Sequence, residues 1–60
     1  MFLEKMLQSQ GFGSRKHCQQ LIKNGAIAIQ GEVMTNAKHK LDLNHLSFSV
    51  YGERFDYREN

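Results

Sequence analysis

Apolar residues near the start of the chain recur with the spacing of α-helices. In Phe2–Gln10 they fall at positions i, i+1, i+4 and i+5, which form one face of a short amphipathic helix. Two glycines among the next three residues interrupt this pattern, and Ser14 is a residue type that commonly caps a helix N-terminus. Leu21 and Ile22 continue an apolar face in a second helix, which the pattern predicts over Arg15–Asn24.

Further along the chain, apolar residues alternate with other residues, which is typical of β-strands. Two short strands, 26–29 and 32–35, are predicted to form a hairpin around Gln30-Gly31, and a third strand is predicted over 46–51. The polar segment 36–44 is expected to be a loop. The predicted fold class is α+β, with two helices in a helix-turn-helix arrangement packed on a small antiparallel three-strand sheet. The predicted core comprises Leu3, Met6, Leu7, Leu21, Ile22, Ile27, Ile29, Val33, Phe48 and Val50.

Length and composition exclude several classes of protein. The 60 residues are enough for one small domain, and the single cysteine, Cys18, cannot form an intramolecular disulfide. The Cys and His residues lack the paired spacing of a structural zinc site, and no apolar run approaches the roughly 18 residues of a membrane span. We therefore expect a cytoplasmic monomer with no bound metal, no cofactor and no membrane contact.

Positive charge is concentrated in the first two thirds of the chain. The net charge is +2, but residues 1–40 carry six Lys or Arg against two Glu, whereas residues 41–60 carry two Arg against four Asp or Glu. An anion-binding surface requires such segregation, although small asymmetries also arise by chance. A binding site for an anionic partner is therefore expected in the first 40 residues.

The second predicted helix has an apolar and a basic face. With about 100° per residue, Lys16, Gln20 and Lys23 lie opposite its apolar side. Arg15 lies in the first turn next to Ser14, where free backbone N–H groups and the helix dipole favour an anion such as phosphate. Solvated lysines on an ordinary surface helix are the alternative interpretation.

A second basic run, Lys38-His39-Lys40, lies in the predicted loop. It extends the basic helix face only if the loop folds beside that helix, and the spacing along the chain does not show this. The alternative is a solvated loop whose charges have no common ligand.

Several motifs, taken together, resemble a known RNA-binding family. Ser14-Arg15 opens the second helix, Leu21-Ile22 lies near its end, and a hairpin motif spans residues 27–34. Leu3–Leu7 matches the usual start of the family loosely. In this order and spacing, about residues 1–52 are similar to the αL RNA-binding domain named after small-subunit ribosomal protein S-four. The resemblance implies that the second helix and the loops around the hairpin contact structured RNA.

The resemblance and the charge pattern together give a set of candidate RNA-binding residues. They lie on the second helix, at the hairpin turn or in the basic loop. They are Ser14, Arg15, Lys16, Gln20, Lys23, Gln30, Gly31, Lys38, His39 and Lys40. Two positions depart from the family pattern: Phe2 stands where many members have arginine, and Gln30 stands where asparagine is usual.

The domain begins at Met1 and runs into the tail Phe55–Asn60. In this it also resembles the N-terminal domain of bacterial small-subunit ribosomal RNA pseudouridine synthases. This implies that it docks on structured ribosomal RNA or its ribonucleoprotein, while a domain outside these 60 residues isomerises uridine to pseudouridine. Residues 1–52 are the expected RNA-binding domain, and residues 53–60 a strand end or a linker to that downstream domain. No catalytic residue is expected in the chain, and Asp42 and Asp56 are interpreted as turn or solvent-facing carboxylates.

Two other functions remain open from the sequence. The chain could be a free-standing ribosome-associated RNA-binding protein, or a protein-interaction module that uses Phe55 and Tyr57 beside an open sheet edge. A catalytic or metal site built on His17 and Cys18 is disfavoured, because neighbours on a helix point about 100° apart.

Overall fold

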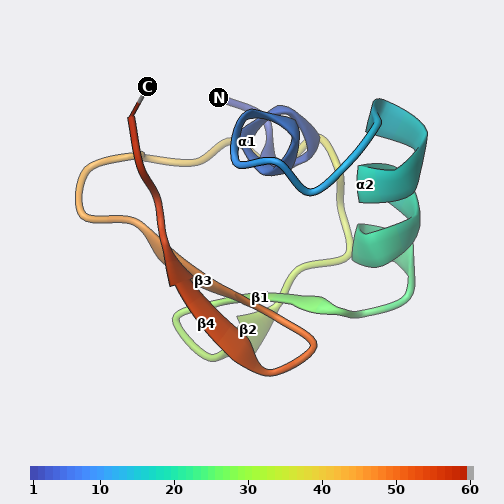
Figure 1. Ribbon diagram of the computed structural model, residues 1–60. Helices are drawn as coiled ribbons and strands as arrows, with labels where there is room; N and C mark the ends of the chain where they lie inside the picture. Colours follow the sequence, from blue (N-terminus) through green and yellow to red (C-terminus); the bar gives the residue numbers. More distant parts are fainter. Residues whose placement is uncertain (60) are drawn as a thin grey trace.

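Two short helices followed by a four-stranded antiparallel sheet make up residues 1–59, the part of the chain that the computed structural model describes (Figure 1). The sheet has the strand order β2-β1-β3-β4, and every neighbouring pair is antiparallel. Asn60, the last residue of the predicted segment 53–60, lies outside the described residues. The elements are α1 (Leu3–Ser9), α2 (Arg15–Lys23), β1 (Ile27–Ile29), β2 (Glu32–Val33), β3 (Ser47–Val50) and β4 (Glu53–Asp56).

The α+β class is confirmed. Both helices begin and end within one residue of the predicted positions. The predicted strand count of three is too low, because residues 53–56 form β4 and pair with β3. Tyr51 and Gly52 both have positive φ, at 49° and 80°, so the chain turns back tightly between these strands. Gly52 therefore lies in the hairpin turn between β3 and β4.

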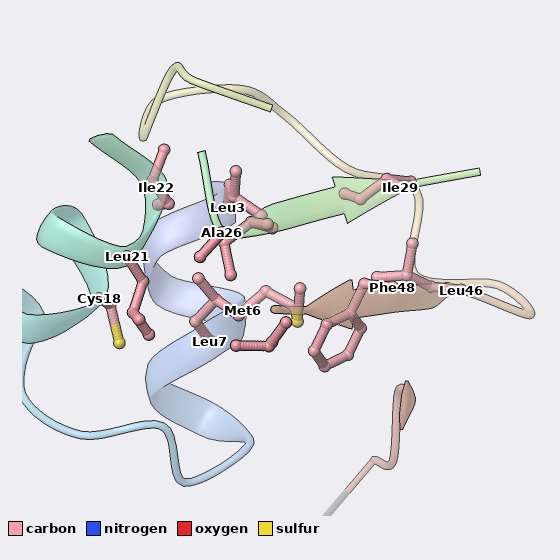
Figure 2. Close-up of a cluster of buried hydrophobic side chains, with 12 residues drawn as sticks. Leu3, Met6, Leu7, Cys18, Leu21, Ile22, Ala26, Ile29, Leu46 and Phe48 are labelled. Carbon is pink, nitrogen blue, oxygen red and sulfur yellow. The ribbon is translucent and has the colours of Figure 1, made fainter. Parts of the chain in front are cut away.

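Both helices and the inner face of the sheet contribute to one apolar core (Figure 2). Its fully buried side chains are Leu3, Met6, Leu7, Cys18, Ile22 and Ile27. The prediction that Val33 belongs to the core is wrong, since this residue is 55% exposed. Val33 pairs with Ala28, whose neighbours Ile27 and Ile29 point inward, so Ala28 and Val33 both lie on the outer face of the sheet.

An aromatic cluster joins the α1–α2 connection to β3 and β4. The ring of Phe12 meets the rings of Phe48 and Phe55 edge to face, with centroids 5.7 and 5.1 Å apart. Phe48 and Phe55, directly opposite each other in the sheet, stack at 5.8 Å. Phe55 is half-buried and packs against the core, as does Tyr57. These two aromatic residues therefore contribute to the fold itself.

The loop after β2 crosses the start of α1. The backbone N–H groups of Leu3 and Glu4 donate to the carbonyls of His39 and Ala37, at 2.9 and 3.2 Å. Phe2, the N-cap residue, provides no side-chain acceptor, so these loop carbonyls satisfy donors that a helix N-terminus leaves unpaired. The N–H of Leu41 donates to the carbonyl of Met1 at 2.9 Å. This contact holds the basic loop against α1.

Candidate nucleic-acid interface

Helix α2 begins as its sequence predicts. Ser14 has extended backbone geometry, and its hydroxyl accepts a hydrogen bond from the N–H of His17 at 3.2 Å. This is the geometry of an N-cap, and it places Arg15 in the first turn of the helix. Both Ser14 and Arg15 are exposed. The helix N-terminus and the arginine side chain are therefore open to solvent on the same part of the surface.

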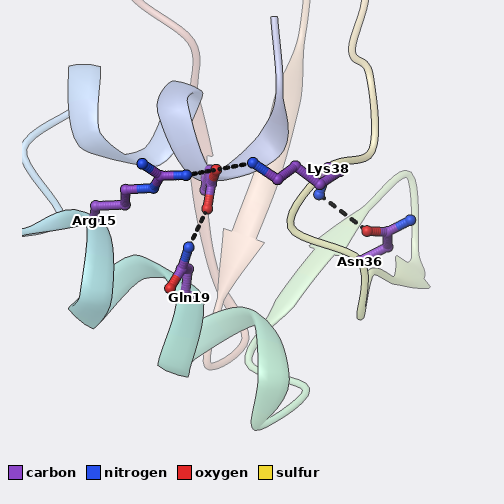
Figure 3. A network of polar contacts seen from close by, with 5 residues as sticks. Arg15, Gln19, Asn36 and Lys38 are labelled. Carbon is purple, nitrogen blue, oxygen red and sulfur yellow. Dashed lines mark hydrogen bonds and ion pairs between the residues drawn. The ribbon is translucent and has the colours of Figure 1, made fainter.

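A buried carboxylate on α1 connects α2 to the basic loop (Figure 3). Glu4 is only 4% exposed. Its Oε2 accepts a hydrogen bond from Gln19 Nε2 at 2.6 Å, and its Oε1 lies 3.1 Å from Lys38 Nζ and 3.4 Å from Arg15 Nη2. We call these four residues the Glu4 cluster. It brings together two cations that are 23 positions apart in the chain.

Hydrogen bonds and charge keep the Glu4 carboxylate ionised. The hydrogen bonds from Gln19 and Lys38 hold the pKa of Glu4 below its usual value of 4.5, against the opposite effect of burial. The positive charges of Lys38 and Arg15 act in the same direction. The Arg15 and Lys38 side chains are 63% and 57% exposed, so each keeps N–H donors that face solvent. The two cations and the one carboxylate give the cluster a net charge of +1, and both cationic side chains reach the surface.

The lowered pKa predicts how stability depends on pH. Ionised Glu4 stabilises the fold above about pH 4.5, and this contribution is lost as the pH falls through the still lower pKa of the folded state. Urea unfolding of the wild type should therefore lose more stability between about pH 6 and pH 3 than unfolding of Glu4→Gln. Glu53→Gln, which changes an exposed carboxylate on β4, is the matched control and should behave like the wild type. Equal pH dependence of Glu4→Gln and wild type would show that ionisation of Glu4 does not stabilise the fold.

A side-chain hydrogen bond and a backbone bridge position the loop that carries Lys38. Asn36 Oδ1 accepts a hydrogen bond from the backbone N–H of Lys38 at 3.0 Å, which forms a local turn (Figure 3). Lys40 pairs with Phe2 in an isolated antiparallel bridge. The basic run therefore lies beside α1 and is linked through Glu4 to α2, which the spacing along the chain did not show.

The outward face of α2 adjoins this cluster. At about 100° per residue, Lys23 and Lys16 lie roughly 40° and 60° around the helix from Gln19, and Gln20 lies beyond them. All three side chains are exposed, and neither lysine forms an ion pair within residues 1–59. These lysines and the cations of the loop form what we call the basic surface. Its residues are Arg15, Lys16, Lys23, Lys38 and Lys40.

Two predicted site residues lie elsewhere. Gln30 and Gly31 form the β1–β2 turn with positive φ of 53° and 80°, at the end of the sheet away from α2 (Figure 1). With Ser47, Ser49 and Arg54 they line a shallow hollow of about 270 Å³. The structure therefore does not bring the hairpin turn together with the basic surface. His39 is exposed in the basic loop.

The family of the chain follows from a comparison with known domains. The family model of the S4 domain matches residues 3–46, which include both helices, the β1–β2 hairpin and the basic loop. The chain belongs to the S4 domain family. The expected similarity to the RNA-binding domain of the S-four type is thus confirmed.

Longer proteins contain a region that is similar to this chain. An uncharacterized RNA pseudouridine synthase of Bacillus subtilis, YtzG, is 41% identical over 59 residues, which are 98% of this chain and 25% of that protein. The crystal structure of a pseudouridylate synthase superposes on the whole chain with a TM-score of 0.84 at 17% identity, and the chain covers 26% of it. The S4 domain described here thus spans about a quarter of the length of the proteins it matches. Its fold is that of the solved synthase over this quarter.

Glu4 is the residue of this S4 domain that sequence reasoning missed. It lies three positions before Leu7 and next to Leu3, so helix periodicity places it at the edge of the apolar face of α1. A carboxylate at a buried position needs a partner, and this rule was the available signal. The identity of the partners depends on the tertiary fold, since Arg15 and Lys38 come from other elements.

The single cysteine of the sequence, Cys18, belongs to the core. It is fully buried, and burial raises the pKa of its thiol, with a smaller effect from the negative charge of Glu4. A protonated, buried thiol is a poor nucleophile and metal ligand. Its weak contact is with the carbonyl of Gly13 at 3.8 Å.

The helices α1 and α2, the two in the described residues, are both too short to cross a membrane.

Proposed function

We propose that this S4 domain binds structured RNA through the basic surface and that it contacts mainly phosphates and helix shape. The observation that carries the proposal is the Glu4 cluster, which joins the loop of Lys38 to α2 and so makes one surface from two basic segments. The predicted RNA-binding roles of Arg15, Lys16 and Lys23 rest on this arrangement.

Phosphate binding suits the chemistry of these side chains. Arg15 presents a planar fork of N–H donors that matches two phosphate oxygens, and lysines act as flexible point charges. Ion pairs with Glu4 restrain the Arg15 guanidinium and the Lys38 ammonium, so these side chains lose less conformational freedom when RNA binds. Because the deep major groove of folded RNA is closed to side chains, recognition by phosphates and shape is expected.

The relatives point to the activity of a longer protein. The similar proteins are described as pseudouridine synthases, and the chain spans about a quarter of each. We propose that the S4 domain delivers a pseudouridine synthase domain, outside these 60 residues, to structured ribosomal RNA of the small subunit in the cytoplasm. In this proposal residues 1–52 contain the RNA-contacting part, residues 53–60 lead toward the catalytic domain, and the domain acts as a monomer without a cofactor of its own.

The salt dependence of RNA binding tests the phosphate model. For a folded fragment of small-subunit ribosomal RNA, the logarithm of the binding constant should fall linearly with the logarithm of salt concentration, by roughly 0.7–0.9 for each phosphate contacted. If the basic surface contributes three to five contacts, the total slope is about 2–4.5. The control is the Arg54→Ala, Arg58→Ala double variant, which removes cations outside the basic surface and should keep this slope. A slope near zero in the wild type would contradict the proposal.

A further inference from the structure

An exposed aromatic ring lies at the edge of the basic surface, next to α1. The Phe2 residue is 39% exposed, and Met1 beside it is 43% exposed. Together with Lys5 and Lys40 they line an open hollow of about 410 Å³. Lys38 Nζ lies 5.4 Å from the centroid of the Phe2 ring, within the range of a cation–π contact. Three lysines therefore surround a partly exposed ring.

The backbone that carries this ring is fixed. Phe2 is the extended N-cap residue of α1, it forms a bridge with Lys40, and its carbonyl accepts a hydrogen bond from the N–H of Met6 at 3.0 Å. The carbonyl of Met1 accepts from Leu41 at 2.9 Å. A phenyl ring has no conventional hydrogen-bonding group, and with Lys38 already beside it, its main interactions with an anionic or neutral ligand are stacking and apolar contact.

We infer that this hollow holds one unpaired nucleobase of the bound RNA, stacked on Phe2, with the neighbouring phosphates bound by Lys5 and Lys40. The inference rests on the proposed function, because it names the kind of nucleotide that the same surface takes. Unpaired bases commonly stack on aromatic side chains, and every base has a face that can do so. The phosphates on either side of such a base carry the charge that the lysines require.

Charge complementarity favours a nucleotide over other occupants. A second copy of the chain would bring its own Lys5, Lys38 and Lys40 to the same place, and these like charges would repel. An ordinary apolar side chain of a partner protein would fill the hollow without neutralising any of the lysines. A nucleotide provides both a base that stacks on the ring and phosphates that neutralise the lysines.

Phe2→Trp provides a direct probe, because the chain contains no tryptophan. Its fluorescence should be quenched by an RNA hairpin with a single unpaired, bulged base and much less by the same hairpin without the bulge. Tyr51→Trp is the matched control, since Tyr51 is 70% exposed on the β3–β4 turn, away from α1 (Figure 1). Its fluorescence should respond equally to both hairpins. Equal quenching of Phe2→Trp by both RNAs would overturn the inference.

Phe2→Leu separates stacking from phosphate binding. Leucine keeps an apolar side chain at the N-cap but offers no aromatic face, so affinity for the bulged hairpin should fall by about 10-fold, the usual effect of losing one stacked base. Affinity for the hairpin without the bulge should stay unchanged, and it also reports that the variant is folded. If Phe2→Leu leaves both affinities unchanged while binding remains steeply salt-dependent, stacking is wrong and phosphate binding stands. If the wild type binds neither hairpin, both proposals fail.

Discussion

Replacing Ile27 by alanine is expected to lower the free energy of unfolding by about 2–4 kcal/mol. Ile27 is fully buried on β1, a central strand of the sheet, so alanine leaves a cavity between the sheet and the helices. A domain of 60 residues has a total stability on the order of 3–9 kcal/mol. The substitution should therefore remove a large part of the stability, which urea unfolding followed by circular dichroism will measure.

Val33→Ala is the matched control for this prediction. It also truncates an aliphatic residue in the same hairpin, but Val33 points to the outer face of the sheet and is 55% exposed. The expected loss is less than about 1 kcal/mol, from strand propensity and partial burial alone. Similar losses for Ile27→Ala and Val33→Ala would contradict the arrangement of the two sheet faces.

The helices could be predicted because their signals are local. Ser14 caps α2 through its own hydroxyl, and Gly25 follows the helix with a positive φ of 74°. Neither signal needs a distant partner. Strand β4 could not be predicted in the same way, since residues 53–56 are mostly charged and become a strand through their pairing with β3. The orientation of Val33 likewise depends on its pairing with Ala28.

The candidate site likewise has a part that local sequence patterns predict and a part that depends on distant contacts. The basic face of α2 follows from helix periodicity, and Lys16 and Lys23 are exposed where the periodicity places them. The position of Lys38 beside Arg15 depends on Glu4, a contact across 34 positions of the chain that no local pattern encodes. The resemblance to the family also implied RNA contacts for Gln30 and Gly31; the structure places them at the β1–β2 turn, apart from the basic surface, and their role in RNA binding stays a prediction.

Reversing two charges on α2 should have the largest effect on RNA binding. The Lys16→Glu, Lys23→Glu double variant loses two phosphate contacts and adds repulsion, so its affinity for a folded ribosomal RNA fragment should fall by about 100-fold or more at about 0.1 M salt. The side chains are exposed, so the fold should persist, with little change in the circular dichroism spectrum. Fluorescence anisotropy with labelled RNA gives the affinity.

The charge-matched control is Arg54→Glu with Arg58→Glu. It changes the net charge of the chain by the same amount but alters β4 and the residues after it, outside the basic surface. Its affinity should fall much less, because long-range repulsion is screened beyond about 10 Å at this salt concentration. Equal losses in the two double variants would show that net charge alone governs binding, and that the basic surface has no special role.

Mapping of backbone amide NMR shifts during titration with folded ribosomal RNA tests the central claim most directly. We predict that the largest shifts occur in residues 15–23 of α2 and 36–40 of the basic loop, which the Glu4 cluster joins. Shifts confined to the outer face of the sheet, around Ala28, Ser49 and Arg54, with none on α2 or the loop, would contradict it.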